Sequence, residues 1–151
     1  KQNSGVQHLI LTNNKITDFA AAALADLLKV NHFIGWVVLN KNAIGNLGAR
    51  KIGEAMPLNK GVKHLVLADN QIGSEGVISL SEGLKRNTTL KSLFLQGNPI
   101  GEDGVRALVE LLKVNKSISK IDIRDIDVNI KSYAMLDLIS ISKHKNIKLI
   151  Y

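Results

Sequence analysis

The chain has 151 residues, of which 45% are hydrophobic and 22% are charged, and its formal net charge is +7 at pH 7. This composition suits one domain spanning residues 1–151, because no linker, low-complexity tract or apolar run of membrane length interrupts it. The absence of cysteine excludes a disulfide framework, a cysteine nucleophile and a thiolate metal site.

In chain order, four similar stretches predict a repeated strand. LILTNN ends at Asn14, VVLNKN at Asn42, LVLADN at Asn70 and LFLQGN at Asn98, so the same pattern returns every 28 residues. Alternating apolar residues open each unit, and helical spacing follows, as in residues 105–112. Each unit is therefore predicted to be a strand, a turn and a helix.

Three apolar columns keep the same spacing and predict a continuous core. The predicted strand rows start at residues 8, 36, 64, 92, 120 and 148, and a helix is expected between successive rows. The columns are Leu9, Val37, Leu65, Leu93 and Ile121; Ile16, Ile44, Ile72, Ile100 and Val128; and Leu24, Ile52, Leu80, Leu108 and Leu136.

The last unit departs from the pattern. By constant spacing, Ile126 takes the Asn position, Asn129 and Ser132 take two glycine positions, and Ser140 takes a position held by Leu112. This decay predicts either a degenerate capping unit or a boundary. The first unit is in full register and the sequence starts without Met, so we expect a fragment of a longer protein whose first edge is covered by another repeat or a partner.

The stretch LKSLFLQGNPIGEDGVRALVELLKVN, residues 90–115, resembles the ribonuclease-inhibitor type of leucine-rich repeat, and the resemblance extends from Val6 to Tyr151. It implies an α/β fold, a curved right-handed solenoid with a parallel sheet on the concave face and helices outside. Members of the family include enzyme inhibitors, GTPase activators, actin-capping proteins and innate immune receptors. The resemblance therefore specifies the fold and leaves the function open.

The repeated asparagines are interpreted as scaffold, with a ligand role as the alternative. An amide once per coil suits backbone groups where strand bends into loop, which predicts a structural ladder of Asn14, Asn42, Asn70 and Asn98. Gly48, Gly76 and Gly104, with Ala20 in the first unit, are predicted to permit close approach of helix to sheet. A second column, Asn31, Asn59, Asn87 and Asn115, is predicted to cap helices in the left-handed conformation, which explains two glycosylation sequons without glycans.

Function is sought at strand positions that face away from the helices, because one face of the sheet is expected to be open. An apolar stripe with aromatic residues and a charged end is a signature of a protein interface, so the fold is expected to bind a protein partner there. For the valines, the alternative is that β-branched residues simply suit a strand. The predicted partner-binding residues are Trp36, Val38, His64, Val66, Phe94, Gln96, Lys120, Asp122 and Arg124.

A second hypothesis uses the positive charge. A basic edge is predicted at the ends of the helices and in the loops that connect each helix to the next strand. This edge would attract an acidic protein, nucleic acid or a membrane surface. Without interleaved aromatic residues, the edge does not favour specific nucleic-acid recognition. The edge contains Lys60, Lys63, Lys85, Arg86, Lys91, Lys113 and Lys116.

Enzymatic chemistry has little support in the sequence, so no catalytic residue, metal or cofactor is assigned. His8 and His64 share a row, but two strand spacings put them about 10 Å apart with Trp36 between them. A GTPase-regulator-like scaffold and a bacterial effector remain alternatives. The lack of cysteine-rich end caps, which extracellular members commonly carry, favours the cytoplasm, or a host cytosol for an effector.

Overall fold

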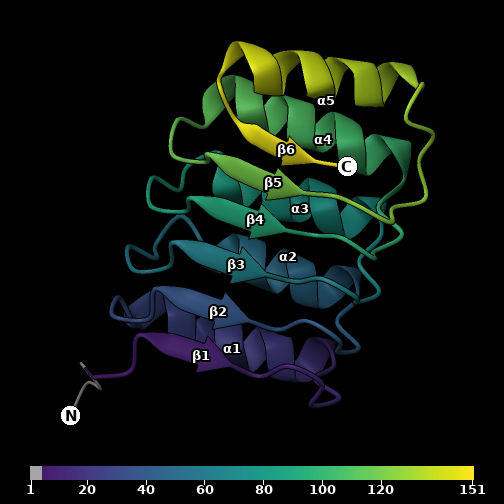
Figure 1. Cartoon of the computed structure of the whole chain (residues 1–151). Coiled ribbons are helices and arrows are strands. Elements are labelled where there is room, and N and C mark those ends of the chain that lie inside the picture. Colours follow the sequence, from purple (N-terminus) through teal and green to yellow (C-terminus); the bar gives the residue numbers. More distant parts are fainter. Residues whose placement is uncertain (1–4) are drawn as a thin grey trace.

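A computed structural model describes residues 5–151 and shows a sheet on one side and helices on the other (Figure 1). The six strands are parallel and lie in chain order across a single sheet. Each pairs with the next at residues 28 apart, as His8 does with Trp36. The strands are β1 (His8–Ile10), β2 (Trp36–Val38), β3 (His64–Val66), β4 (Ser92–Phe94), β5 (Lys120–Asp122) and β6 (Lys148–Ile150).

A helix follows each of the first five strands, and each helix packs against the next (Figure 1). Apolar residues at helical spacing form the buried side; in α4, for example, Val105, Leu108 and Leu112 are buried while Glu110 is exposed. The helices are α1 (Asp18–Val30), α2 (Asn46–Ala55), α3 (Ser74–Leu84), α4 (Gly101–Val114) and α5 (Tyr133–His144).

The apolar columns form one core between the sheet and the helices. Val37, Leu65, Leu93 and Ile121 are all fully buried, whereas Leu9 in the first coil is only half-buried. A coil in a solenoid contacts only its neighbours, so the first coil has cover on one side alone.

The last helix corrects the sequence-based register. Constant spacing places Leu136 in the core column, but Leu136 is 51% exposed and Leu138 is fully buried. Leu138 lies 30 residues after its counterpart Leu108, because a longer loop precedes α5, and strand pairing returns to a spacing of 28 at β6. Ser132 is therefore not a replacement for glycine: it is the N-cap of α5, and its hydroxyl accepts a hydrogen bond from the Met135 N–H.

The first Asn column holds successive coils together through backbone groups. The Asn70 amide donates to the carbonyls of Leu39 and Leu67, and its oxygen accepts from the Ile44 N–H. In the first coil, the Asn14 side chain is exposed and, among residues 5–151, donates only to the Thr12 carbonyl. An asparagine of this column therefore makes fewer side-chain hydrogen bonds in the first coil than in a central coil.

The second Asn column forms another ladder, and its predicted left-handed conformation is wrong. Asn31 and Asn115 have φ angles of −94° and −70°. The Asn115 amide donates to the carbonyls of Leu84 and Asn87 in the preceding coil, while its oxygen accepts from the N–H groups of residues 117 and 118. These asparagines therefore join the end of one helix to the next coil, which explains why Asn87 and Asn115 are buried.

The repeated glycines permit close approach both to the preceding coil and to the buried isoleucine of their own coil; a Cβ on Gly48 would lie 2.8 Å from the Ile44 side chain. A Cβ on Gly48 would lie 2.7 Å from the Asp18 carboxylate and 3.0 Å from the Ala21 side chain, both in the preceding helix α1. Ala20, the counterpart of this position in the first coil, is exposed because no described coil precedes it.

Candidate functional site

The open face of the sheet consists of the strand side chains that point away from the helices. Ile10 is 65% exposed there and Trp36 is 37% exposed, although both are large apolar residues. Val38, Val66 and Phe94 continue the row of Ile10 in register and are half-buried, and Trp36 lies beside this apolar row, in register with His8 and His64. The structure thus brings the predicted apolar row together on one uncovered surface.

Trp36 is held between two histidines. Its ring stacks on His64 with centroids 3.8 Å apart and planes 23° apart, and it meets the edge of His8 at 6.1 Å. The rings come from β1, β2 and β3, whose starting residues are paired neighbours in the sheet. A large aromatic side chain that is already fixed loses little conformational entropy when a partner covers it.

His64 lies in a partly buried and electropositive place. Burial lowers the pKa of His64, and the nearby ammonium groups of Lys63 and Lys120 lower it further, because all three oppose the charged imidazole. Its Nδ1 atom is buried and has no hydrogen-bond partner among residues 5–151. The neutral ring that stacks on Trp36 is therefore the favoured form at neutral pH.

Phe94 lies at the boundary between the apolar row and the charged end of the sheet. The Lys120 ammonium lies 4.6 Å from the centroid of the Phe94 ring, a cation–π contact. The contact comes from neighbouring strands, because residue 92 of β4 pairs with Lys120 of β5. Lys120 thus covers part of Phe94 and places a positive charge at the end of the row.

Asp122 differs from the exposed contact residue that the sequence predicts. It is only 2% exposed, and its carboxylate accepts hydrogen bonds from Nε and NH2 of Arg124 at 3.0 and 2.7 Å. The paired carboxylate raises the pKa of Arg124. Asp122 therefore positions Arg124, which is the member of the pair that a partner can reach.

Two residues further along each strand than the apolar row, Thr12, Asn40, Ala68 and Gln96 form a row that is more polar and more enclosed. Gln96 is half-buried, and its Oε1 atom has no hydrogen-bond partner in the described part of the chain. Beside it Ala68 is buried, while the Thr12 hydroxyl donates to the Asn40 side chain at 2.7 Å. This row frames the apolar row but offers little large side-chain surface of its own.

A cavity opens where the open face meets the basic edge, at the start of β1, β2 and β3. Its volume is about 430 Å³. The sequence predicts Lys60 and Lys63 as part of the basic edge and Trp36 as an open-face residue, but it does not predict that they line one cavity. The missed signal is the 28-residue spacing of His32 and Lys60, which puts two loops side by side next to Trp36. The lining residues are Gln7, His8, His32, Phe33, Gly35, Trp36, Lys60, Gly61 and Lys63.

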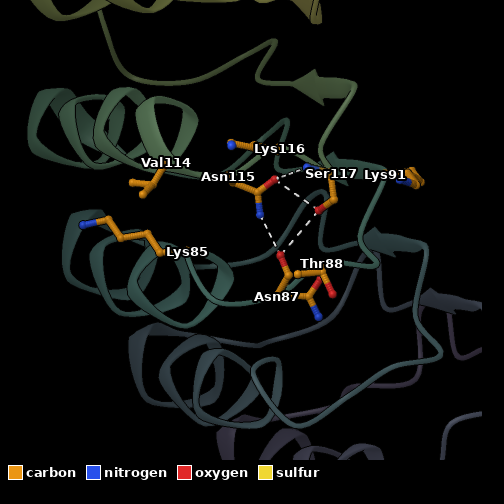
Figure 2. Close-up of a pocket in the computed structure, with 8 residues that line it drawn as sticks. All are labelled: Lys85, Asn87, Thr88, Lys91, Val114, Asn115, Lys116 and Ser117. Carbon is orange, nitrogen blue, oxygen red and sulfur yellow. Dashed lines mark hydrogen bonds between the residues drawn. The ribbon is translucent and has the colours of Figure 1, made fainter.

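A second cavity of about 300 Å³ lies along the basic edge between the third and fourth coils. Figure 2 shows Lys85 and Lys91 at opposite sides of it, with the Asn87 and Asn115 ladder between them. The Lys85 ammonium already pairs with Glu82. The Asn ladder thus separates lysines of this cavity, and the charge of Lys85 is neutralised by its ion pair.

Within residues 5–151, no group of three or more His, Asp or Glu side chains is placed to hold a metal ion. In the same range, no helix has the length and apolar character needed to cross a membrane.

Comparisons with known proteins agree with the fold. A family profile described as "Leucine Rich repeat" matches residues 2–25, 59–81 and 86–109. The solved structure of "Leiomodin-1 Actin-Binding Site 2 (ABS2)" is similar with a TM-score of 0.81 at 18% sequence identity, covering 95% of this chain and 83% of that chain. No curated protein matches the sequence. The predicted fold class is thus confirmed: the chain is an α/β leucine-rich repeat solenoid.

Proposed function

We propose that the protein is a noncatalytic interaction module, of the ribonuclease-inhibitor type of leucine-rich repeat, that binds a protein partner on the open face of its sheet. The supporting observation is the apolar row of Ile10, Val38, Val66 and Phe94, with Trp36 beside it, on a surface that the helices leave uncovered. At about 4.8 Å between strands, the row from β1 to β4 is roughly 14 Å long, enough for the apolar centre of an interface.

Trp36 and the charged residues in and just after β5 have different roles in this proposal. Trp36 is the anchor, because stacking on His64 fixes its ring before binding. Lys120 and Arg124 provide a charged rim, and Asp122 keeps Arg124 in place. A rim of this kind sets orientation and partner choice more than affinity.

The fold likeness does not supply the partner. Actin binding is a property named for the leiomodin segment and belongs to that protein, and at 18% identity the likeness concerns the fold alone. The partner is therefore defined here by chemistry: a protein surface with apolar side chains for the row and acidic groups for the rim.

The test compares two aromatic double variants in pull-downs from cell extract at low and high salt. Trp36→Asp/Phe94→Asp places charge in the apolar row and beside it. Phe19→Asp/Tyr133→Asp is the matched control, because both residues are 87% exposed and lie at the starts of helices α1 and α5. Circular dichroism first establishes that every variant is folded.

The proposal expects a partner that is retained at high salt, lost with Trp36→Asp/Phe94→Asp and kept with the control pair. An apolar interface depends little on ionic strength, whereas one made by exposed charges weakens as added salt shortens the Debye length. Binding that survives in the folded row variant would refute the open face as the binding surface.

The alternative is an electrostatic surface along the basic edge, favoured by the run of lysines around its cavities. Lys85 and Lys113 are paired with Glu82 and Glu110, so their reversal alone tests it poorly. Lys91→Glu/Lys116→Glu is sharper, because neither ammonium has an ion pair within residues 5–151. If the edge is the site, binding falls with added salt and with this pair.

A further inference from the structure

The cavity at the corner of the open face and the basic edge carries positive charge without compensation. Of the described residues, two lysines and two histidines line it, and no acidic residue does. The Lys63 ammonium has no hydrogen bond or ion pair with residues 5–151, and the Lys60 ammonium donates only to the Pro57 carbonyl at 3.1 Å. By contrast, Lys85 in the cavity between the third and fourth coils pairs with Glu82.

The same cavity has apolar walls that continue into the open face. Phe33 is 46% exposed there, and Trp36 lines the cavity and also lies beside the apolar row. His32 accepts a long hydrogen bond from the Lys60 N–H at Nδ1, which leaves Nε2 as the other polar atom of that ring. A group bound here would therefore meet cationic donors on one side and aromatic surface on the other.

We infer that this corner cavity recognises a carboxylate of an acidic segment in the protein partner, with the apolar residue next to that carboxylate lying against Trp36 and Val38. The inference rests on the proposed function and adds the chemical class of the segment. The carboxylate meets the Lys60 and Lys63 ammonium groups, and the apolar neighbour covers the exposed part of the indole.

A carboxylate fits these donors better than a phosphate. No arginine lines the cavity, so the bidentate fork that commonly recognises phosphate is missing from this site. The ammonium groups come from one loop and are point charges on flexible stems, which suits one carboxylate beside an aromatic wall. A phosphorylated segment is accordingly a competing outcome of the test.

The test uses three acetylated and amidated pentapeptides in which leucine alternates with glutamate, glutamine or phosphoserine. Trp36 is the only tryptophan, so its fluorescence reports occupation of the corner directly. Backbone amide shifts of Gly61 and Trp36, measured by NMR, identify the place of binding. The titrations are repeated with Lys60→Gln/Lys63→Gln and with the matched control Lys91→Gln/Lys116→Gln, which removes the same charge from other coils of the edge.

The inference expects the glutamate peptide to bind about tenfold tighter than the glutamine peptide, since one charge-assisted contact is of that order. The preference disappears in Lys60→Gln/Lys63→Gln and remains in the control pair. It is overturned if the preference persists in Lys60→Gln/Lys63→Gln, if only the phosphoserine peptide binds, or if no peptide shifts Trp36.

The corner site and the apolar row can fail separately. Equal binding of the glutamate and glutamine peptides, with Gly61 unshifted, removes the carboxylate site while leaving the apolar row as a binding surface. The proposed function is refuted instead by the pull-down, if the natural partner still binds the folded Trp36→Asp/Phe94→Asp variant.

Discussion

Replacing Asn98 with alanine removes four hydrogen bonds of the Asn ladder, the longest of which is the 3.5 Å bond from the Asn98 amide to the Gln96 carbonyl. The Asn98 amide donates to the carbonyls of Leu67 and Leu95, both at 2.9 Å, and its oxygen accepts from the Ile72 N–H at 3.0 Å. Asn98 is only 1% exposed, so water has little access to the groups left behind. The loss therefore depends on how many of these groups keep another partner.

Two of the four backbone groups become unsatisfied. The Gln96 carbonyl keeps its bond from the Asp69 N–H. The Leu67 carbonyl also accepts from Asn70 and keeps that bond, whereas the Leu95 carbonyl and the Ile72 N–H lose their side-chain partner. An unmade hydrogen bond at a buried group costs about 1–3 kcal/mol, so Asn98→Ala is expected to lower the free energy of unfolding by about 3 kcal/mol.

Urea unfolding followed by circular dichroism measures this loss, and Asn14→Ala is the control from the same column. The Asn14 side chain is exposed and has one bond, to the Thr12 carbonyl, so its replacement is expected to cost less than about 1 kcal/mol. With a slope near 2 kcal/mol/M, Asn98→Ala shifts the midpoint by about 1.5 M. Equal losses in the two variants would show that burial of the ladder does not determine its strength.

Two further predictions concern the last helix and the stacked histidine. Leu138→Ala is expected to lower the free energy of unfolding in urea by about 3 kcal/mol, and Leu136→Ala by less than about 1 kcal/mol, because of the two only Leu138 is fully buried. A larger loss for Leu136→Ala would show that the constant 28-residue spacing continues into α5. Trp36 fluorescence should show a pH transition with a midpoint below 6.5 that His64→Gln abolishes. The unfolded chain protonates His64 more readily, so this residue lowers folded-state stability as the pH falls below 6.5; a midpoint at or above 6.5 would contradict its electropositive burial.

Most of the solenoid follows from the repeated sequence because each coil has the same neighbours. A buried column such as Val37, Leu65 and Leu93 repeats the same apolar residue type at the same contact. The last coil does not follow, since α5 is positioned by packing its apolar side on α4. Counting at constant spacing cannot detect the longer loop that moves Leu138 into the place predicted for Leu136.

The open-face residues could be predicted because alternation along a strand fixes which side chains share a face. Their contacts could not, because contacts depend on rotamers and on neighbouring strands. Alternation placed Asp122 beside Arg124 and did not reveal that the carboxylate is buried under the guanidinium. The stacking of Trp36 on His64 is likewise a property of two paired strands.

The sequence by itself determined the repeat, the order of strand and helix, and the residues of the open face, because these depend on local periodicity that every coil shares. Only the tertiary structure decided how the ends differ from the middle and where a cavity forms. The corner beside Trp36 combines three strand starts with the loops around His32 and Lys60. Its charge and shape arise from residues that the chain brings together only after the coils have stacked.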